Sequence, residues 1–337
     1  MTIGVIGSGS WGTAQVKILS DNGHRVCWGV RNERIREHLF RRRHNPQYLS
    51  SVQFDTSLLD VRLLPEEVIS ASDIVVVAVP SAYMEEVFAG VDPAALCMKK
   101  VVSAVKGMVP GRFQLLNDFL QEKFSFPLSS YISLMGPCHA EEVASERLSY
   151  LTFSGTDLPL AERIAGLFAN SYINTVVNAD VYGGQYAAIM KNIYALGAGI
   201  AHGLEYGDNF LSVFIANCAR EMGLFLQKAT SLNTGLTGED LYRLYTSSVY
   251  LGDLLVTSYS LYSRNRTFGN MIGKGYSVQS AQLEMNMIAE GYPASRAIQK
   301  VNEKVRAYLP IATAIYEILW EKKSPEEGFR SIEKELI

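Results

Sequence analysis

A glycine-rich hexapeptide near the amino terminus has the residue types and spacing to bind a phosphate-bearing ligand. Gly7-Ser8-Gly9-Ser10-Trp11-Gly12 directly follows an apolar run and directly precedes a helical run that begins at Thr13. In a GxGxxG turn the first glycine permits the tight bend, the second lets backbone approach a pyrophosphate, and the third allows close packing of helix on strand. The helix N-terminus offers N–H groups and partial positive charge to the anion. The pattern predicts a dinucleotide site at Gly7, Gly9, Ser10, Trp11 and Gly12, in preference to a merely tight turn.

The end of the second apolar run bears on the choice of dinucleotide. It reads Trp28-Gly29-Val30-Arg31-Asn32. An NAD site usually carries an acidic residue here to hold the ribose hydroxyls, whereas an arginine suits the 2′-phosphate of NADP. We therefore predict NADP or NAD as cofactor, with a preference for NADPH and with Arg31 at the ribose phosphate. An ordinary surface arginine is the alternative, because a flexible loop can shift the register.

Two later apolar runs end in residues suited to the same edge of a sheet. They are followed by Val79-Pro80-Ser81 and by Val105-Lys106-Gly107. Ligands of open α/β sheets lie at the carboxyl ends of the strands. We expect Pro80 next to the cofactor and Lys106 in contact with an anionic group of cofactor or substrate. A strand-ending proline and a solvated loop lysine are the alternatives.

A mainly parallel sheet is needed to bring these segments together. Short apolar runs alternate with amphipathic stretches in the first half of the chain, which predicts strands with helical crossovers. The runs are nearly all apolar and do not alternate with polar residues, as in strands covered on both faces. The predicted strands are residues 3–6, 25–30, 74–79, 101–105, 131–135, 151–153 and 173–177.

The second half has helical periodicity and no convincing strand. Helices are predicted over residues 185–202, 210–232, 238–250, 278–290 and 294–309, and turn residues over 178–184 predict a connector. We therefore predict an α/β N-terminal Rossmann-like domain with a mainly parallel sheet over residues 1–180. An all-α C-terminal domain, which would bind substrate and carry the catalytic residues, is predicted over 181–337.

Composition narrows the class of protein. The chain has 337 residues, 48% of them hydrophobic and 19% charged, which excludes overall disorder. A net charge of -3 gives no general attraction for nucleic acid or anionic membrane, so a phosphorylated ligand needs local cations and backbone amides. No apolar run is long enough to span a membrane and no signal peptide is visible, so we expect a cytoplasmic protein. The cysteines, Cys27, Cys97, Cys138 and Cys218, form no CxxC pair, and we expect no metal site.

Beyond the glycine-rich loop, motifs along nearly the whole chain resemble one family, the soluble bacterial NAD(P)-dependent glycerol-3-phosphate dehydrogenases. Several motifs in the right order are far more specific than one loop. They are GSGSWGTA (7–14), NPQYL (45–49), VPS (79–81), KG (106–107), GPCHAEEV (136–143), MKNIYALGAGIAHGL (190–204), GDN (207–209), LGDLLVTSYSLYSRNRTFG (251–269) and EGY (290–292). The resemblance implies reversible reduction of dihydroxyacetone phosphate to sn-glycerol 3-phosphate for phospholipid synthesis, by a homodimer.

The resemblance also implies the catalytic residues. Lys191 matches the family's catalytic lysine, and an ammonium there would stabilise and protonate the oxygen of a ketone that receives hydride. A lysine lying along a helix surface is the alternative. Asp253 would keep Lys191 charged and accept hydrogen bonds from substrate, and Thr257 would share its helix face. Helix capping is the other use of Asp253. Asn192, next to Lys191, is expected to contact substrate.

Further substrate and cofactor contacts follow from the same resemblance. Ser263, Arg264 and Asn265 match the family's phosphate-binding motif, and Arg264 has a planar fork suited to phosphate oxygens of substrate and cofactor. An arginine-rich surface turn is the alternative, since Arg266 is also present. Expected near the cofactor are Ala140, Ile288 and Glu290, and expected near the substrate are Gly136 and Cys138.

The sequence departs from the family at several positions. Cys138 stands where a serine or threonine is usual, which weakens any hydrogen bond to substrate because a thiol is a poor donor. Asn217 lies in a segment where the family more often has an arginine, and Tyr292-Pro293 follows the EG pair.

Two other functions fit parts of the pattern. A β-hydroxyacid or ketopantoate reductase has the same architecture and would use Arg264 for a carboxylate. A non-catalytic dinucleotide sensor would keep the glycine loop but would not need Lys191 and Asp253 together. The paired lysines and the SRN string favour the phosphorylated substrate.

Overall fold

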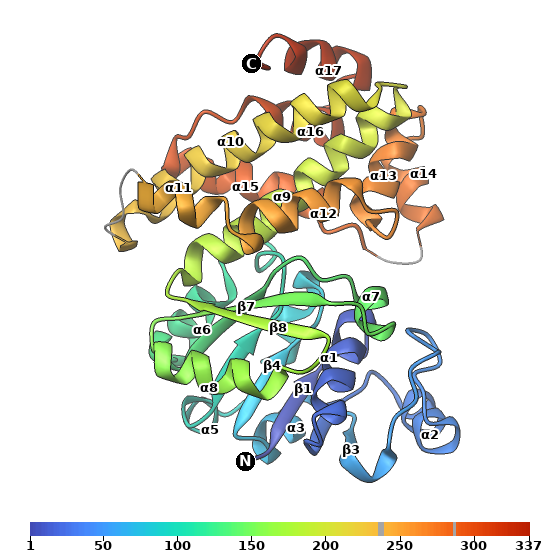
Figure 1. Ribbon diagram of the computed structural model, residues 1–337, viewed down its shortest axis with the longest axis vertical. Helices are drawn as coiled ribbons and strands as arrows, with labels where there is room; N and C mark the ends of the chain where they lie inside the picture. Colours follow the sequence, from blue (N-terminus) through green and yellow to red (C-terminus); the bar gives the residue numbers. More distant parts are fainter. Residues whose placement is uncertain (235–238, 286–287) are drawn as a thin grey trace. The chain divides into compact units, whose positions relative to one another are not determined.

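The structure is a computed structural model and describes residues 1–234, 239–285 and 288–337 (Figure 1). The chain forms two compact units. The first consists of Met1–Val105 and Val109–Val181, and the second of Lys106–Met108 and Tyr182–Ile337.

An eight-stranded sheet organises the first unit (Figure 1). Its order is β3-β2-β1-β4-β5-β6-β7-β8, and all neighbours are parallel except β6 and β7. The predicted Rossmann-like, mainly parallel sheet is confirmed. The strands are β1 (Ile3–Ile6), β2 (Val26–Gly29), β3 (Leu59–Arg62), β4 (Ile74–Val77), β5 (Lys100–Ser103), β6 (Tyr131–Met135), β7 (Ser149–Gly155) and β8 (Ile173–Asn178).

Strand β3 was missing from the prediction. It lies at the edge of the sheet, and its buried residues Leu59 and Val61 alternate with the charged Asp60 and Arg62. Two charged residues among its four make this strand too polar to give an apolar run. The other predicted strands are present, although β2, β4 and β5 end one or two residues earlier than predicted.

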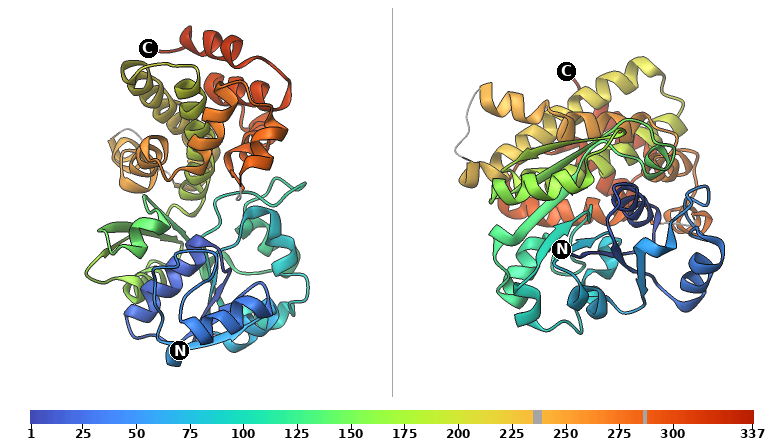
Figure 2. Two further views of the ribbon diagram at one scale, coloured as in Figure 1. Left: turned by 90° about the vertical axis from the view of Figure 1, so that its right-hand side faces the viewer. Right: turned by 60° about the horizontal axis from the view of Figure 1, so that its bottom comes forward.

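Helices cover both faces of the sheet in the first unit (Figures 1 and 2). A Cβ at Gly4 of β1 would touch Val68 of α3, whereas Val5 belongs to the same core cluster as Val16 of α1, so these helices lie on opposite faces. Residues Ile74–Val77 are completely buried for this reason. The helices are α1 (Ser10–Asp21), α2 (Glu33–Arg42), α3 (Pro65–Ala71), α4 (Met84–Val87), α5 (Pro93–Cys97), α6 (Leu116–Phe124), α7 (Ala140–Ala144) and α8 (Leu158–Phe168).

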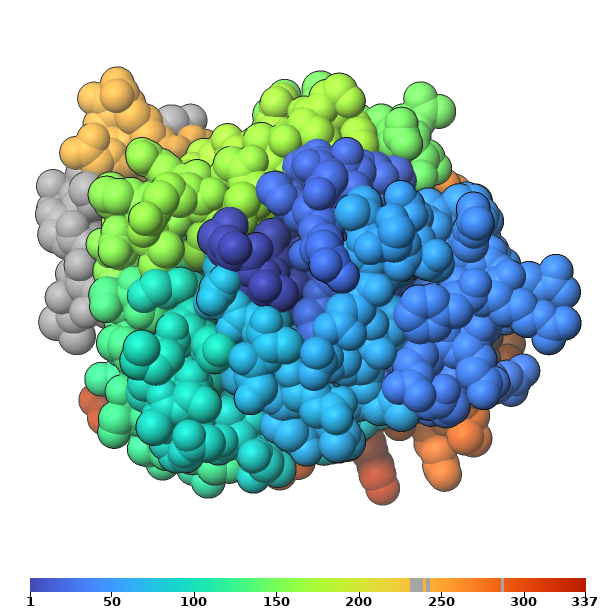
Figure 3. All heavy atoms as spheres, turned by 90° about the horizontal axis from the view of Figure 1, so that it is seen from below, coloured from blue at the N-terminus to red at the C-terminus, as the bar shows by residue number. Residues whose placement is uncertain are grey.

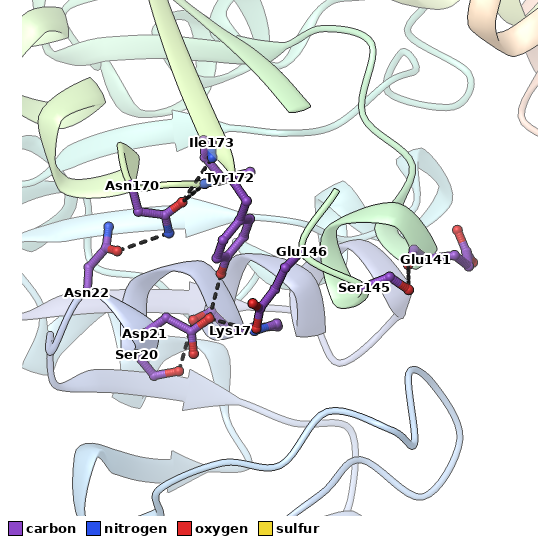
Figure 4. A network of polar contacts seen from close by, with 10 residues as sticks. All are labelled: Lys17, Ser20, Asp21, Asn22, Glu141, Ser145, Glu146, Asn170, Tyr172 and Ile173. Carbon is purple, nitrogen blue, oxygen red and sulfur yellow. Dashed lines mark hydrogen bonds and ion pairs between the residues drawn. The ribbon is translucent and has the colours of Figure 1, made fainter. Parts of the chain in front are cut away.

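A cluster of polar side chains ties α1 to the segments after α7 and before β8 (Figure 4). The Lys17 Nζ atom lies 2.5 Å from Asp21 and 3.0 Å from Glu146. The Tyr172 hydroxyl donates to Asp21 at 2.5 Å. The helix behind the glycine loop is therefore fastened to a distant part of the same unit. In Figure 3 the dark-blue first residues lie in the middle of this unit's surface, consistent with the central place of β1.

The second unit contains only helices and turns among its described residues. Its helices are α9 (Val181–Gly203), α10 (Asp208–Thr234), α11 (Glu239–Tyr245), a π-helical turn (Ser248–Gly252), α12 (Asp253–Tyr259), α13 (Arg264–Gly273), α14 (Val278–Glu284), α15 (Gly291–Val305), α16 (Pro310–Trp320) and α17 (Pro325–Glu333). The predicted helical character is confirmed. No helix in the described ranges is long and apolar enough to cross a membrane.

Several predicted boundaries in this unit are wrong. The connector shrinks to residues 179–180 because α9 already begins at Val181, and the helix predicted over 278–290 ends at Glu284. The start of the helix predicted over 238–250 falls partly outside the described residues.

Helix α9 is the core of the second unit. Its residues from 187 to 201 are all buried. Glycines allow α13 to approach it at backbone distance: a Cβ at Gly269 would lie 1.9 Å from the Leu196 carbonyl oxygen, and one at Gly199 would lie 2.1 Å from that of Arg266. This close crossing fixes where the residues of α9 and α13 meet.

Candidate active site

The glycine loop connects β1 to α1, and a different physical reason applies to each of its three glycines. Gly7 has a φ of +127°, and a Cβ there would lie 2.4 Å from the Ala78 carbonyl oxygen. A Cβ at Gly12 would lie 2.2 Å from the Gly7 carbonyl oxygen. Gly9 has an ordinary φ of −73°, and an added Cβ would meet nothing within 4 Å. Neither strain nor packing requires a glycine at this position, and the space beside Gly9 is open to a ligand.

The remaining loop residues begin helix α1. Ser10 is its first residue and is buried, and the half-buried Trp11 packs against the core. No side chain caps this helix at Gly9. The first N–H groups of α1 therefore keep their capacity to bind an anion.

Two other predicted cofactor residues, Arg31 and Pro80, follow strands β2 and β4, which lie on either side of β1. The exposed Arg31 follows β2, and its guanidinium lies 6.0 Å from the centre of the Tyr83 ring. Tyr83 belongs to the short turn that begins after the exposed Pro80. Arg31 and the segment after β4 are thus brought together.

The predicted loop after β6 also belongs to the first unit. Gly136 has a φ of +132°, and a Cβ there would lie 2.7 Å from the Tyr150 carbonyl oxygen of β7. Cys138 is buried in the core of this unit, and Ala140 begins α7. Lys106, by contrast, belongs to the second unit.

In the second unit, Lys191 and Asp253 form a direct, buried ion pair. Lys191 lies on α9 and is 4% exposed, and Asp253 begins α12 and is 1% exposed. The Asp253 Oδ1 atom accepts a hydrogen bond from the Lys191 Nζ atom. The Oδ2 atom is buried and accepts no hydrogen bond from the described part of the chain. One carboxylate oxygen therefore holds Lys191, and the other keeps its capacity to accept a proton donor.

The surroundings change the acidity of Lys191. The pKa of Lys191 is lowered to about 7, chiefly by burial and also by the nearby Lys106 ammonium, while Asp253 acts in the opposite direction. Burial disfavours the charged form because it removes hydrating water. Lys191 is thus able to exchange a proton near neutral pH, which a surface lysine is not.

The π-helical turn places Asp253 inside a continuous helical segment. Gly252 precedes it with helical angles, so Asp253 is not a helix cap. Thr257 lies one turn further on the same face, as its spacing predicts, and its hydroxyl donates to the Asp253 carbonyl oxygen at 2.6 Å. A π turn is common at functional sites because it shifts the register of the side chains that follow.

A buried amide pair joins α9, α13 and α15. The Asn265 Nδ2 atom donates to Asn192 Oδ1 at 2.9 Å, and the Gly291 N–H donates to Asn265 Oδ1 at 2.8 Å. Gly291 must be small because a Cβ there would lie 2.4 Å from the Asn192 carbonyl oxygen. Asn192 lies beside Lys191 in sequence, so the pair is anchored close to the ion pair.

The two arginines of the SRNR string have different surroundings. The Arg266 Nη1 atom donates to the Tyr259 carbonyl oxygen at 3.0 Å, and Ser263 caps α13 by accepting from the Arg266 N–H. Arg264, the first residue of α13, is exposed and forms no ion pair with any described residue. A cation at a helix N-terminus opposes the helix dipole. Arg266 is therefore structural, whereas Arg264 keeps its charge available for an anion.

Ile288 and Glu290 lie just before α15. Ile288 is 40% exposed and lines a surface hollow with Phe268, Met285 and Tyr292, all of the second unit. Glu290 is half-buried and immediately precedes α15. No group of metal-binding residues occurs in the described ranges.

Three residues that contact the glycine loop were absent from the predicted site. Trp28, Asn45 and Thr13 are fully buried and bind the loop's carbonyl groups. Asn45 was visible in the sequence only as part of the NPQYL motif, because a loop asparagine before a proline is ordinary turn chemistry.

Comparisons with known proteins cover nearly the whole chain. Residues 2–161 match the family model described as the NAD-dependent glycerol-3-phosphate dehydrogenase N-terminus, and residues 180–330 match the corresponding C-terminus. A glycerol-3-phosphate dehydrogenase (NAD(P)+) of Halalkalibacterium halodurans is 33% identical over 330 residues, or 97% of this chain and 92% of that protein. One of Streptococcus thermophilus is 35% identical over 330 residues, or 97% and 93%.

Solved structures agree on the fold. A glycerol-3-phosphate dehydrogenase from Coxiella burnetii has a TM-score of 0.86 at 22% identity, with 98% of each chain covered. Two family models and close relatives therefore match both units. The chain belongs to the NAD(P)-dependent glycerol-3-phosphate dehydrogenase family and is an oxidoreductase that uses NAD or NADP.

Proposed function

We propose that this protein reduces dihydroxyacetone phosphate to sn-glycerol 3-phosphate reversibly, with Lys191 as general acid and base. The observation that carries the proposal is the buried pair of Lys191 and Asp253, in which the lysine has a lowered pKa and one carboxylate oxygen has no partner in the described chain. A proton donor with a pKa near the working pH is the most effective general acid. Family membership supplies the substrate.

The reaction needs one hydride and one proton. When bound, the reduced nicotinamide supplies the hydride to the carbonyl carbon. Lys191 stabilises the charge that develops on the carbonyl oxygen and transfers a proton to it. The neutral amine that remains is protonated again from solvent. In the reverse direction neutral Lys191 takes the proton of the C2 hydroxyl.

Asp253 has two tasks in this scheme. Its Oδ1 atom holds Lys191 and favours the charged ammonium. Its Oδ2 atom is the acceptor for a substrate hydroxyl, because a buried carboxylate oxygen without a partner costs free energy until a donor arrives. Thr257 supports this carboxylate by fixing the adjacent backbone.

Arg264 is the proposed phosphate ligand, with Asn265 and Asn192 adding amide donors from the same unit. An unpaired guanidinium at a helix N-terminus combines with the first N–H groups to favour a dianion. The uses of Lys106, Gly136, Cys138 and Ser263 in substrate binding remain predictions. Binding of the remote phosphate would orient the carbonyl for reaction.

The first unit is the proposed dinucleotide-binding domain and the second the proposed substrate domain. The open space at Gly9 and the uncapped start of α1 fit a pyrophosphate. Arg31 is the proposed contact of the 2′-phosphate, which gives a preference for NADPH. Arg31→Asp is expected to raise the KM for NADPH at least tenfold and to spare NADH, because a carboxylate repels the phosphate. An equal effect on both cofactors would contradict this role.

Physiological context is proposed from the family alone. The product would feed glycerophospholipid synthesis in the cytoplasm, and the chain would form a homodimer. Light scattering on the purified protein tests the dimer, and a monomeric mass contradicts it.

The direct test of the reaction follows the absorbance of NADH or NADPH after addition of dihydroxyacetone phosphate. Cofactor oxidation that is lost in Lys191→Ala supports the proposal. Oxidation with 2-keto acids or ketopantoate, but not with dihydroxyacetone phosphate, would contradict it and would make Arg264 a carboxylate ligand.

A further inference from the structure

Three consecutive carbonyl groups of the glycine loop accept hydrogen bonds from buried side chains. The three donors have no exposed surface, so water does not compete for these bonds. The bonds run from Trp28 Nε1 to the Gly7 oxygen at 3.0 Å, from Asn45 Nδ2 to the Ser8 oxygen at 3.0 Å, and from Thr13 Oγ1 to the Gly9 oxygen at 2.8 Å.

These bonds determine the direction of the next N–H groups. No cis peptide bond occurs in the described chain. In a trans peptide the C=O and the following N–H point in opposite directions. With the carbonyls turned to interior donors, the N–H groups of Ser8, Gly9 and Ser10 face away from those donors. Successive outward N–H groups form a favourable site for an anion.

Asn45 is held in the one orientation that allows this. Its Oδ1 atom accepts from the N–H groups of Gln47 at 2.9 Å and Tyr48 at 3.3 Å. Its Nδ2 atom donates to the Thr13 hydroxyl at 2.8 Å as well as to Ser8. All four hydrogen-bonding positions of the amide are used. A flipped amide would set an oxygen against two acceptors.

Thr13 extends the same chain of bonds. Because its hydroxyl oxygen accepts from Asn45, its proton is directed to the Gly9 carbonyl. The order of donors therefore runs from Asn45 through Thr13 to the loop. Two side chains outside the GxGxxG pattern thus help to hold two of its peptide planes, and at Gly9 they act together with the helical hydrogen bond from the Thr13 N–H to the same oxygen, at 2.9 Å.

We infer that Asn45 and Thr13 are positioning residues that turn the N–H groups of the glycine loop toward the cofactor's pyrophosphate. They act through the peptide planes and do not touch the cofactor themselves. The inference rests on the proposed placement of the cofactor on this loop. It predicts weaker dinucleotide binding without a change in the chemistry of Lys191.

Thr13→Val tests the relay with almost no change of shape. The Kd for NADH and NADPH, measured by fluorescence titration, should rise about three- to tenfold, which is the usual cost of one lost hydrogen bond. The KM for the cofactor should rise with it, while kcat at saturating cofactor and the KM for dihydroxyacetone phosphate stay within twofold, or about 0.4 kcal/mol. Thr13→Ser, which restores the hydroxyl, should bind normally.

Thr230→Val is the matched control. Thr230 is equally buried and its hydroxyl donates to the Leu226 carbonyl at 2.8 Å, in the other unit. This variant should lower the melting temperature as much as Thr13→Val and leave the Kd unchanged. An equal rise in Kd in both variants would mean that general destabilisation, and not loop orientation, weakens binding, and would overturn the inference.

Asn45→Asp removes the donors but keeps the shape and the acceptor for Gln47 and Tyr48. It should weaken dinucleotide binding more than Thr13→Val does, since two donors are lost and a negative charge is placed beside the loop. If Asn45→Asp does not fold, Asn45→Ser also removes both amide donors and adds no charge, and binding should again be weaker than in the wild type. A wild-type Kd in a folded Asn45 variant and in Thr13→Val overturns the inference.

Gly9→Val separates this inference from the proposed site. The new side chain enters open space with ordinary backbone angles, so the fold should persist. Strongly weakened binding in Gly9→Val confirms that the cofactor lies on the loop, and the Thr13 result then decides the inference alone. Normal binding in Gly9→Val would show that the cofactor does not bind at this loop, and it would overturn the inference as well.

Discussion

Lys17 in the first unit and Lys191 in the second are both buried lysines with carboxylate partners. Lys17 is 7% exposed and bonds to Asp21 and Glu146, and Lys191 is 4% exposed and pairs with Asp253. The pKa values of the two lysines are nevertheless shifted in opposite directions. Burial opposes the charge of Lys17, but hydrogen bonds to its two carboxylates raise its pKa, whereas burial lowers the pKa of Lys191.

The difference lies in the balance of charge and water around each ammonium. The carboxylates of Lys17 reach solvent, with side chains 36% and 62% exposed. Lys191 has one buried carboxylate and a second lysine, Lys106, as neighbours. Two carboxylates make Lys17 a permanent cation that joins segments (Figure 4). Deep burial and a like charge make Lys191 able to give up its proton.

Replacing each of the two lysines by methionine should give the largest difference in kcat between the two regions. Lys191→Met should lower kcat for dihydroxyacetone phosphate about 10²- to 10⁴-fold, because the general acid is lost. Lys17→Met should keep kcat within a few-fold of wild type. Steady-state kinetics on both variants measures this. Equal losses would show that removal of any buried lysine disables the protein.

Asp253→Asn sharpens the contrast through the partner. Loss of the carboxylate charge should lower the pKa of Lys191 further, so that less of it is protonated at pH 7 and kcat falls about 10- to 100-fold. Asp21→Asn, beside Lys17, is the matched control and should leave kcat nearly unchanged. Normal activity in a folded Asp253→Asn would refute the role of this carboxylate.

Lys106→Met removes the like charge from the Lys191 cluster. The pKa of Lys191 should rise, so the pH above which reduction slows should move upward by about one unit. The profile of kcat against pH at saturating substrate measures the shift, and saturation separates it from any loss of binding. A downward shift would contradict the stated electrostatics.

The smallest expected effect is on stability in Lys17→Met. The free energy of unfolding should fall by about 1–2 kcal/mol, because Glu146 loses its hydrogen-bonded partner and Asp21 keeps only Tyr172. A lysine with a raised pKa stabilises fully below its unfolded pKa of about 10.4 and loses this effect only as pH rises through the folded pKa. Denaturant unfolding should therefore give the same difference at pH 7 and pH 9. A difference that vanishes by pH 9 would contradict the raised pKa.

The sequence predicted the fold best where a short local pattern alone determines the structure. The GxGxxG turn and the completely apolar strands, such as Ile74–Val77, predict a Rossmann-like sheet because both faces must be covered. Strand β3 escaped prediction because an edge strand needs few apolar residues. Thr13 and Asn45 escaped it because their role depends on contacts between segments that sequence spacing does not reveal.

For Lys191, spacing alone favoured a helix-surface lysine, and only the family resemblance identified it. The composition of α9 held a further signal. This helix is apolar on every side over most of its length, and such helices are buried, so its single lysine had to be buried too. The π turn before Asp253 has no comparable signal, because it depends on packing around Ser248–Gly252.

The most direct test of the central claim, that Lys191 exchanges the proton of the reaction, is the pH dependence of kcat in both directions. Reduction of dihydroxyacetone phosphate needs the ammonium and should slow as pH rises through about 7. Oxidation of sn-glycerol 3-phosphate needs the neutral amine and should accelerate as pH rises. We predict that kcat falls with pH for reduction and rises with pH for oxidation. Both dependences should be absent from the residual activity of Lys191→Ala. Flat profiles between pH 6 and pH 9 in the wild-type protein, with chemistry limiting the rate, would contradict the account.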